Sequence, residues 1–327
     1  MADLTFNPGF RQRSDCAVIV ACDANYLPYA SVLARQLAPL AGAGFDILIG
    51  GPDPETLPGG LIAAGIGHVA ARDPVLEARL PLDARRSVAT YMDVFLARAL
   101  RGIYRRILVL DADILHDRGD PAGLFAAGMH GHAVAAVRDH QQWRRPNRRS
   151  GDQKKLGWAA APYFNAGVVM FDLAAWAEAD MPARCAEFAA TRLAGVGRDQ
   201  ALLNGVLHGD WAEMSPMWNW QYTWASSYLT QMADPCLIHF IGPKKPWRPD
   251  ARGVVPMRWR MAYDGLHHMF PDAGGIAPDL DVRAFPPAGE IRRALWRQFR
   301  AAGPMAAYLA RFPDIYTILP GQPQPAA

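Results

Sequence analysis

The segment Arg106-Ile107-Leu108-Val109-Leu110-Asp111-Ala112-Asp113 joins a short apolar run to two carboxylates. Four consecutive apolar residues bounded by charged ones predict a buried central strand. Side chains alternate between the faces of a strand, so Asp111 and Asp113 point the same way, with Cα atoms roughly 6.6 Å apart. Both carboxylates can then reach one hard divalent cation. Ligands of open α/β sheets bind beyond the carboxyl ends of the strands, although a solvated acidic turn explains Asp-x-Asp equally well.

The composition narrows the class of protein. The chain has 327 residues, of which 51% are hydrophobic, and this suits one elaborate domain or two small ones. The net charge of +3 is mild and does not favour a nucleic-acid partner. No apolar run predicts a transmembrane helix, and residues 1–7 do not predict a secretory signal. We therefore expect a cytoplasmic protein, with four cysteines as buried free thiols: Cys16, Cys22, Cys185 and Cys236.

Strand-like and helix-like segments alternate along the chain. Buried-strand patterns recur at residues 15–22, 45–51, 133–137 and 168–171. Apolar residues at helical spacing occupy residues 32–40 and 88–100, and residues 54–72 predict a short helix followed by a strand. This alternation predicts an α/β fold with a mostly parallel, mixed sheet flanked by helices.

Residues 138–161 interrupt this alternation with seven basic residues. Trp143 and Trp158 are interleaved among them. One interpretation is a solvated basic loop, and the other is a mobile lid over an anionic ligand, with the tryptophans as stacking platforms. The basic run is short and isolated, which makes a nucleic-acid site the weaker hypothesis.

The C-terminal part has a different character. Residues 271–289 are rich in Pro and Gly, so we expect a globular domain over residues 1–265 and a linker with a basic tail over residues 266–327. In the tail, Ile291, Leu295 and Phe299 form one helical stripe with Trp296 beside it. Arginines occupy the other side: Arg292, Arg293, Arg297 and Arg300.

Two interpretations of this tail are open. Residues 290–312 either contact the anionic surface on the inner face of the membrane, or dock on the domain through the same apolar stripe. Pro304 predicts that the helix has roughly four turns or fewer, because proline lacks the backbone N–H that a helix interior needs.

Two polar motifs lie downstream of the Asp-x-Asp strand. Asn165 opens a strand and is followed by Ala166 and Gly167, whose small size allows a ligand to approach the backbone while the amide holds a sugar hydroxyl. Asp199 and Gln200 open a helix, where the helix dipole and free N–H groups lie. A simple N-cap explains Asp199 equally well.

A histidine at a strand end forms the last motif. His239 precedes a turn at Gly242 and Pro243, and Lys245 follows. This arrangement offers one metal ligand and one cation to a diphosphate. A lone histidine is more often structural, but the lysines and the separate Asp-x-Asp favour the ligand interpretation.

In this order the motifs resemble glycosyltransferase family 8, the family of glycogenin and of the bacterial lipopolysaccharide galactosyl- and glucosyltransferases. The resemblance covers about residues 15–250 and rests on Asp23-x-Asn25-Tyr26, Asp111-x-Asp113, Asn165-Ala166-Gly167, Asp199-Gln200 and His239-x-x-Gly242-x-x-Lys245-Pro246-Trp247. It implies a GT-A fold with a catalytic domain over residues 1–265. It also implies a nucleotide-sugar donor, usually UDP-linked, a Mn²⁺ or Mg²⁺ ion, retention of anomeric configuration, and a glycan or glycolipid acceptor as in lipopolysaccharide biosynthesis.

The resemblance assigns a role to each matching residue. The metal would be held by Asp111, Asp113 and His239. The nucleotide pocket would be lined by Ala21, Asp23 and Asn25. The diphosphate would meet the backbone of Gly242 and the side chain of Lys245. The donor sugar would be surrounded by Asp139, Asn165, Ala166, Asp199 and Gln200.

The catalytic route has two versions. Asp199 is the candidate carboxylate for a double displacement, whereas internal return needs no nucleophile and places Gln200 beneath the anomeric centre. We favour internal return. One residue departs from the family pattern, because Tyr91-Met92-Asp93 carries an acid where many relatives have Arg or Lys.

Two other functions are open on these residues. A nucleotidyltransferase that forms nucleotide sugars also uses strand-end carboxylates, although no Gly-rich phosphate loop follows the first strand. A non-catalytic nucleotide-sugar-binding scaffold on the same fold is the other alternative, and Asp93 keeps it open.

Overall fold

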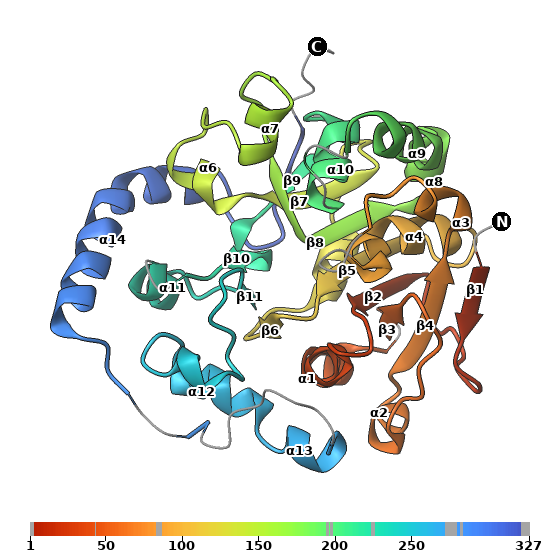
Figure 1. Cartoon of the computed structure of the whole chain (residues 1–327), viewed down its shortest axis with the longest axis horizontal. Helices are drawn as coiled ribbons and strands as arrows, with labels where there is room; N and C mark the ends of the chain where they lie inside the picture. Colours follow the sequence, from red (N-terminus) through yellow and green to blue (C-terminus); the bar gives the residue numbers. More distant parts are fainter. Residues whose placement is uncertain are drawn as a thin grey trace.

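The computed structural model describes residues 3–42, 44–82, 87–193, 196, 199–223, 226–271, 280–281 and 284–321. A nine-stranded sheet runs through this part of the chain (Figure 1). In spatial order its strands are β1 (Asp3–Phe6), β4 (Gly67–Arg72), β3 (Asp46–Gly51), β2 (Cys16–Ala21), β5 (Arg106–Asp111), β8 (Phe164–Asp172), β7 (Val134–Arg138), β9 (Ala212–Met214) and β12 (Ile318–Leu319).

The direction of the strands brings the predicted motifs to one edge of the sheet. β4, β3, β2 and β5 are parallel, and Ala21 is in register with Asp111. β8 runs antiparallel to β5, with Leu110 opposite Val168. The start of β8, which carries Asn165, therefore lies at the edge where β2 and β5 end. The sheet is mixed, as expected, and its parallel part is centred on β2.

A small second sheet adds the histidine to this edge. Its strands are β10 (Trp220–Gln221), β11 (Leu237–His239) and β6 (Ile114–His116). β6 begins directly after Asp113 and pairs antiparallel with β11, so that His239 lies opposite Ile114. This pairing places the His239 motif beside the Asp-x-Asp motif.

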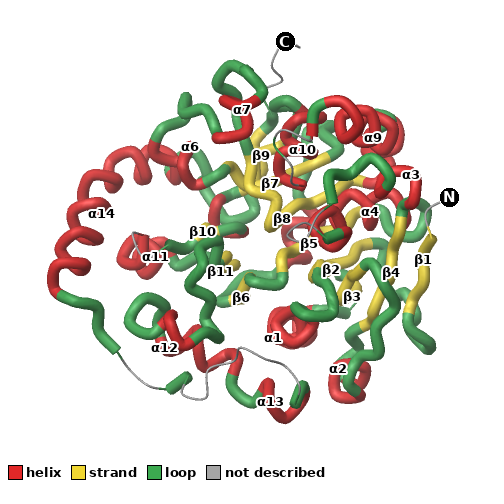
Figure 2. Tube along the Cα trace, in the orientation of Figure 1, coloured by secondary structure: helices red, strands yellow, loops and turns green. Residues whose placement is uncertain are grey.

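Helices cover both faces of the large sheet (Figure 2). Alternate residues of β2 separate the two cores, since Ala17 and Ile19 belong to one and Val18 and Val20 to the other. The first core includes residues of α3 (Pro74–Glu77), α4 (Met92–Ala99), α8 (Leu173–Glu178), α9 (Met181–Thr191) and α10 (Asp199–Leu207). The second includes residues of α1 (Leu27–Leu37), α2 (Gly59–Ala63), α5 (Pro121–Ala126) and α14 (Ala288–Leu309).

The expected strands at 15–22, 45–51, 133–137 and 168–171 correspond to β2, β3, β7 and β8. The expected helix over 88–100 begins as a 3₁₀ turn (Val88–Tyr91) and continues as α4. The four cysteines are buried and free, as predicted. Residues 272–279 and 282–283 of the expected linker lie outside the described residues. None of the described helices has the length and apolar character needed to cross a bilayer.

The lid hypothesis for residues 138–161 predicted that its two tryptophans are exposed stacking platforms, and this prediction is wrong. The segment forms α6 (His140–Arg144) and α7 (Gly151–Lys155), the latter begun by a Ser150–Gln153 capping box. Trp143 and Trp158 are buried, and Trp143 Nε1 donates to the Arg138 carbonyl at 2.7 Å. Both indoles are therefore core residues, because burial of their large apolar surface outweighs any role as an exposed platform.

The C-terminal helix contradicts two expectations. α14 docks through Ala294, Gln298, Ala301, Met305 and Tyr308, whereas Leu295, Trp296 and Phe299 are 48%, 61% and 73% exposed. Docking through the apolar stripe is thus wrong, since the helix presents small residues to the domain and leaves the larger side chains outside.

Pro304 does not end this helix, which has 22 residues and continues to Leu309. Proline in a helix interior costs about 3 kcal/mol. Beyond it Met305 and Tyr308 are buried, and the Tyr308 hydroxyl donates to Glu213 Oε1 at 2.7 Å. These tertiary contacts offset the local cost. The remaining described helices are α11 (Ser227–Ala233), α12 (Met257–Arg260) and α13 (Leu266–Met269).

Candidate active site

Three side chains converge where β5 and β11 end. Nε2 of His239 lies 3.1 Å from Asp113 Oδ1 and 3.5 Å from Asp111 Oδ2. One ligand atom from each residue lies within 4.8 Å of the other two. Two carboxylates and an imidazole are suitable ligands for Mn²⁺, and the carboxylate oxygens can also bind Mg²⁺. The residues predicted as metal ligands are therefore close enough to share one ion.

The orientation of the His239 ring is fixed by a hydrogen bond at the ring nitrogen that faces away from the aspartates. Its Nδ1 lies 3.0 Å from Oδ1 of Asn219, and an amide oxygen only accepts hydrogen bonds. Nδ1 therefore carries the proton, and Nε2 faces the two aspartates. Asp113 Oδ1 is buried and has no hydrogen-bond partner in the described part of the chain. An orphaned carboxylate oxygen facing an imidazole nitrogen fits a bound cation.

Lys245 joins this cluster. Its ammonium donates to Asp113 Oδ2 at 2.5 Å and to the Phe240 carbonyl at 2.6 Å. Asp113 and His239 are mostly shielded, while the Asp111 side chain is 49% exposed. The cluster therefore opens to solvent on the Asp111 side.

The charges of this cluster reinforce one another. Burial of Asp113 opposes ionisation, but His239 and Lys245 outweigh it and hold the pKa of Asp113 below its ordinary value. Burial is the largest single effect on His239 and opposes its charged form, yet the Asp113 and Asp111 carboxylates together outweigh it and raise the pKa of the imidazole. A group of two acids and two bases at one strand end is typical of a functional site.

Gly167 makes the close packing possible. A Cβ atom at this position would lie 2.2 Å from Cε1 of His239 and 2.8 Å from Oδ2 of Asp111. The start of β8 therefore provides a flat wall against which both side chains rest. The small residues after Asn165 predict close approach of a ligand, and in the structure Gly167 accommodates two of the candidate metal ligands.

A chain of amides links the predicted donor-sugar residues to the cluster. Gln200 Oε1 accepts from Asn165 Nδ2 at 3.1 Å and lies 3.4 Å from the Ala166 N–H donor. Asn165 Oδ1 accepts from Asn219 Nδ2 at 2.9 Å. Since Asn219 also binds His239, hydrogen bonds run without a break from Gln200 to the histidine.

Asp93 lies buried at the start of α4. Only 6% of its surface is exposed, and its Oδ1 accepts from the Val94 N–H at 2.8 Å. Burial, followed by the charges of Asp199 and Asp111, raises the pKa of Asp93 well above its ordinary value. At this position the chain therefore holds a buried acid, whose charged form is disfavoured, in place of the cation that the family pattern predicts.

The remaining residues predicted to contact the nucleotide and the diphosphate lie at or just after the ends of β2 and β11. Ala21 is beside Asp111 by register, and Asp23 and Asn25 follow it on the same edge. Asp23 Oδ1 accepts from the Tyr26 N–H at 3.1 Å, so it also stabilises the turn before α1. Gly242, in the turn after β11, is half-buried, and no described neighbour lies within 4 Å of a Cβ built there.

Asp139 and Asp199 both lie at the start of a helix. Asp139 caps α6, with Oδ1 accepting from the Gln141 N–H at 2.9 Å. Asp199 is the first residue of α10, as expected for a helix start.

Asn219 is a site residue that the sequence motifs did not predict. It is fully buried between Trp218 and Trp220, after a 3₁₀ turn over Pro216–Trp218. The surrounding segment has no helical or strand period long enough to predict a face. No local signal distinguishes this amide, and only its contacts identify it.

The family model for glycosyl transferase family 8 matches residues 17–251. The chain belongs to this family. Among curated relatives, the lipopolysaccharide 1,2-glucosyltransferase of Escherichia coli strain K12 is 30% identical over 180 residues, which cover 51% of this chain and 52% of that protein. General stress protein A of Bacillus subtilis strain 168 is 24% identical over 163 residues, covering 45% and 54%. This family 8 chain spans about half the length of the curated relatives it matches.

Solved structures show the same fold. The galactosyltransferase LgtC, in complex with donor and acceptor sugar analogs, aligns with a TM-score of 0.56 at 21% identity, over 85% of this chain and 99% of that one. The bifunctional glycosyltransferase WbbM aligns with a TM-score of 0.57 at 18% identity, over 90% and 53%. The predicted GT-A fold is confirmed for this family 8 chain.

Proposed function

We propose that this chain is a metal-dependent, retaining glycosyltransferase that moves a hexosyl unit from a UDP-linked sugar to a glycan or glycolipid acceptor. The observation that carries the proposal is the convergence of Asp111, Asp113 and His239 with Lys245 at one edge of the sheet. Family membership and the LgtC-like fold support it. Residues 1–265 would form the catalytic domain and residues 266–327 the linker and basic tail.

Each group has a chemical task in this reaction. Asp111, Asp113 and His239 would hold Mn²⁺ or Mg²⁺, which supplies positive charge against the departing diphosphate. Lys245, which pairs with Asp113 in the structure, would bind a phosphate oxygen, as would the backbone at Gly242. Ala21, Asp23 and Asn25 would line the nucleotide pocket at the end of β2. These contacts stabilise the leaving group without a proton transfer.

The donor sugar would lie among Asp139, Asn165, Ala166, Asp199 and Gln200. Retention by internal return needs a polar group beneath the anomeric carbon, and we assign this place to Gln200. The amide chain through Asn165 holds Gln200 in position. Gln200→Ala should lower turnover without abolishing it, because no covalent bond to residue 200 is required. A sugar found covalently attached to Asp199 by mass spectrometry would overturn this route in favour of double displacement.

Nucleotide binding is the first test of the proposal. The melting temperature is measured with UDP, GDP and their common sugar conjugates, each with and without Mn²⁺, since a ligand that binds the native state raises its stability. We expect a shift for one UDP-sugar that requires Mn²⁺ and disappears in Asp113→Ala. The matched control is Asp53→Ala, which removes an exposed carboxylate paired with Arg72 at 3.2 Å.

The other outcomes are equally informative. Release of pyrophosphate from a nucleoside triphosphate and a sugar phosphate would replace the proposal by a nucleotidyltransferase. Nucleotide binding without transfer or hydrolysis would favour a scaffold, with the buried Asp93 as the residue that removed the activity.

We also propose that residues 290–312 contact an anionic membrane surface from the cytoplasmic side. The exposed Leu295, Trp296 and Phe299 lie beside exposed arginines that make no ion pair within the described residues: Arg292, Arg293, Arg297 and Arg300. Apolar side chains enter the interface while arginines attract anionic headgroups.

Flotation with vesicles tests this contact. The protein should float with phosphatidylcholine vesicles that contain phosphatidylglycerol, less so without it, and poorly as the double variant Trp296→Glu, Phe299→Glu. Ile62→Glu changes an exposed apolar residue of α2 and serves as the control. Flotation that is unchanged in the double variant would remove the proposal.

A further inference from the structure

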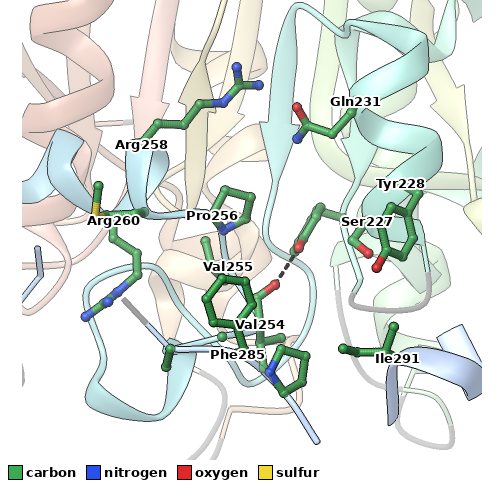
Figure 3. A pocket seen from close by; sticks show the side chains of 15 residues that line it. Ser227, Tyr228, Gln231, Val254, Val255, Pro256, Arg258, Arg260, Phe285 and Ile291 are labelled. Atoms are coloured by element: carbon green, nitrogen blue, oxygen red, sulfur yellow. Dashed lines mark hydrogen bonds between the residues drawn. The ribbon is translucent and has the colours of Figure 1, made fainter. Parts of the chain in front are cut away.

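A cavity of about 480 Å³ lies outside the candidate active site. It is bounded by α11, by the segment 253–260 that leads into and includes α12, and by residues 284–291 at the start of α14. Figure 3 shows Ser227, Tyr228 and Gln231 of α11 on one side and Arg258 and Arg260 on another. This volume is typical of sites for small molecules.

The walls of the cavity are mainly apolar. Val254, Val255 and Pro256 form a continuous wall, and the ring of Phe285 lies beside them (Figure 3). Phe285 is 88% exposed, which is unusual for a phenylalanine and leaves a large aromatic surface unburied. The Tyr222 hydroxyl donates to the Val254 carbonyl at 2.5 Å, so that this polar pair is satisfied within the wall.

Two polar features stand at the cavity. The Ser227 hydroxyl is buried, and the described residues offer it no hydrogen-bond partner. Such a group costs free energy unless a ligand or water binds it. Arg258 has a side chain that is 56% exposed and lies 5.1 Å above the Trp259 ring, so a cationic group stands at the rim. The Asp117 carboxylate lies 3.3 Å from it.

The cavity is continuous with the exposed stripe of α14. Ile291 lines the cavity and begins the stripe that continues through Leu295 and Phe299, each one helical turn further along. α11 is joined to α14 by a hydrogen bond from the Leu229 N–H to Gln298 Oε1 at 2.8 Å. Met232, on the same helix as Tyr228, is 83% exposed. Apolar surface therefore extends from the cavity onto both helices.

We propose that this cavity receives one hydrocarbon chain of an anionic membrane lipid. The chain would lie against Val254, Val255 and Phe285, with an ester group of the lipid near Ser227 and its phosphate near Arg258 at the rim. Charge complementarity and the continuity through Ile291 carry the choice of a lipid. The inference rests on the membrane contact proposed for residues 290–312, but it needs no particular transfer reaction.

A lipid chain in the cavity differs from a helix lying on a bilayer. Surface contact by α14 alone leaves the wall at Val255 and the Ser227 hydroxyl without a role. A lipid withdrawn from the leaflet would contact both, would cover the exposed ring of Phe285, and would fix the domain against the membrane. The Tyr222 N–H donates to the His239 carbonyl at 2.8 Å, so the cavity wall is bonded directly to the strand that carries a candidate metal ligand. The membrane and the active site would thereby be held in a fixed relation.

Calorimetric titration of the full chain with octyl, decyl and dodecyl phosphate, below the concentrations at which they form micelles, tests the site. Affinity should rise roughly fourfold for each further methylene that is buried. Ser227→Trp fills the cavity and should weaken dodecyl phosphate binding by roughly tenfold or more. Met232→Trp adds the same side chain to the exposed part of α11, outside the cavity lining, and should bind as the wild type does.

Phe285→Ala gives a second variant at an exposed position, where misfolding is not expected, and it should bind several times more weakly. Affinity that does not depend on chain length, or equal competition by inorganic phosphate, would overturn the inference in favour of a simple anion site. Unchanged binding in Ser227→Trp combined with loss in Trp296→Ala would also overturn it and would place the chain on the surface of α14.

The same samples separate this inference from the proposed function. A nucleotide-dependent rise in melting temperature without binding of alkyl phosphates would overturn the lipid site alone. Binding of alkyl phosphates without any nucleotide effect would overturn the transferase and leave the lipid site intact. Vesicle flotation of Ser227→Trp should persist, because its α14 stripe is unaltered.

Discussion

Asn219 holds His239 from behind, with Oδ1 of the amide 3.0 Å from Nδ1 of the imidazole. The amide nitrogen of Asn219 donates a hydrogen bond to Asn165 Oδ1 at 2.9 Å. Because both ends of the amide are engaged, its orientation is fixed, and so is the ring nitrogen that faces Asp111 and Asp113. The ring is thereby prepared to act as a metal ligand before any ion arrives.

Replacing Asn219 by Ala should therefore weaken Mn²⁺ binding by about 10- to 100-fold, because the imidazole loses the acceptor that selects its tautomer. Asn219→Asp keeps an acceptor and should restore most of the affinity. Calorimetric titration with Mn²⁺ measures both, with the exposed Asn147→Ala as the control. Equal affinity in Asn219→Ala and wild type would show that the hydrogen bond does not prepare the ring.

Gly167→Ala should disturb the same cluster by a different cause. The added Cβ would lie 2.2 Å from His239 Cε1 and 2.8 Å from Asp111 Oδ2, so both side chains must move. We expect a loss of about 1–3 kcal/mol in the free energy of unfolding together with loss of Mn²⁺ binding. Denaturant unfolding and Mn²⁺ titration measure the two effects.

Gly60→Ala is the matched control, since nothing lies within 4 Å of a Cβ at that position in α2. It should be neutral or stabilise by up to about 1 kcal/mol. Full Mn²⁺ affinity in Gly167→Ala would mean that the wall of β8 can yield without cost to the site.

Glu213 should anchor α14 to the sheet. This buried carboxylate accepts from Arg138 at 2.7 Å, from Tyr308 at 2.7 Å and from Arg311 at 2.9 Å. Glu213→Ala leaves the Arg138 guanidinium buried without its charge partner and should cost about 3–5 kcal/mol in the free energy of unfolding. Limited proteolysis should then cut near α14 sooner.

An exposed ion pair provides the comparison for Glu213. Asp53→Ala breaks its pair with Arg72 and should change the free energy of unfolding by less than about 1 kcal/mol. If both variants lost similar stability, the buried network would not be the anchor.

His68 should give the protein a marked dependence on acid. Its side chain on β4 is buried, and this burial lowers the pKa of His68 to about 4. Between about pH 6.5 and pH 4 the unfolded chain binds a proton at this residue while the folded chain does not. The free energy of unfolding should therefore fall as the pH is lowered through this range, by up to about 3 kcal/mol.

His68→Phe should remove that part of the pH dependence, as measured by urea unfolding at several pH values. His267→Phe, at an exposed histidine, is the control. An identical slope in His68→Phe and wild type would assign the acid sensitivity to other groups.

The sequence predicted most strands of the sheet, but it did not predict which faces of the surrounding elements pack against the domain. β2, β3 and β5 are short apolar runs whose burial follows from composition alone, so their positions were predictable. The C-terminal helix was predicted as amphipathic, yet its buried face differs from its most apolar one. Hydrophobic pattern identifies a helix, but the side that docks depends on which side chains fit the neighbouring surface. Ala294 and Ala301 fit where Phe299 does not.

The buried tryptophans show the same limit. Trp143 packs 5.3 Å from Trp220 and stacks on Tyr308 at 6.0 Å, two residues far away in the chain. A sequence of arginines around an indole suggests exposure, because neighbours in sequence are the only context available. Its actual neighbours come from β10 and α14.

The sequence by itself determined that a buried strand ends in an Asp-x-Asp motif, since an apolar run bounded by charged residues is a local property of the chain. The expectation that both carboxylates share one strand face is wrong, because β5 ends at Asp111 and Asp113 lies in the turn before β6. The motifs also predicted His239 and Lys245, but only the tertiary structure shows that Lys245 pairs with Asp113 and that Asn219 orients His239. The pairing of β6 with β11 and the antiparallel entry of β8 bring these side chains within hydrogen-bonding distance. Such contacts depend on long-range strand order and on close packing at Gly167, which no short stretch of sequence encodes.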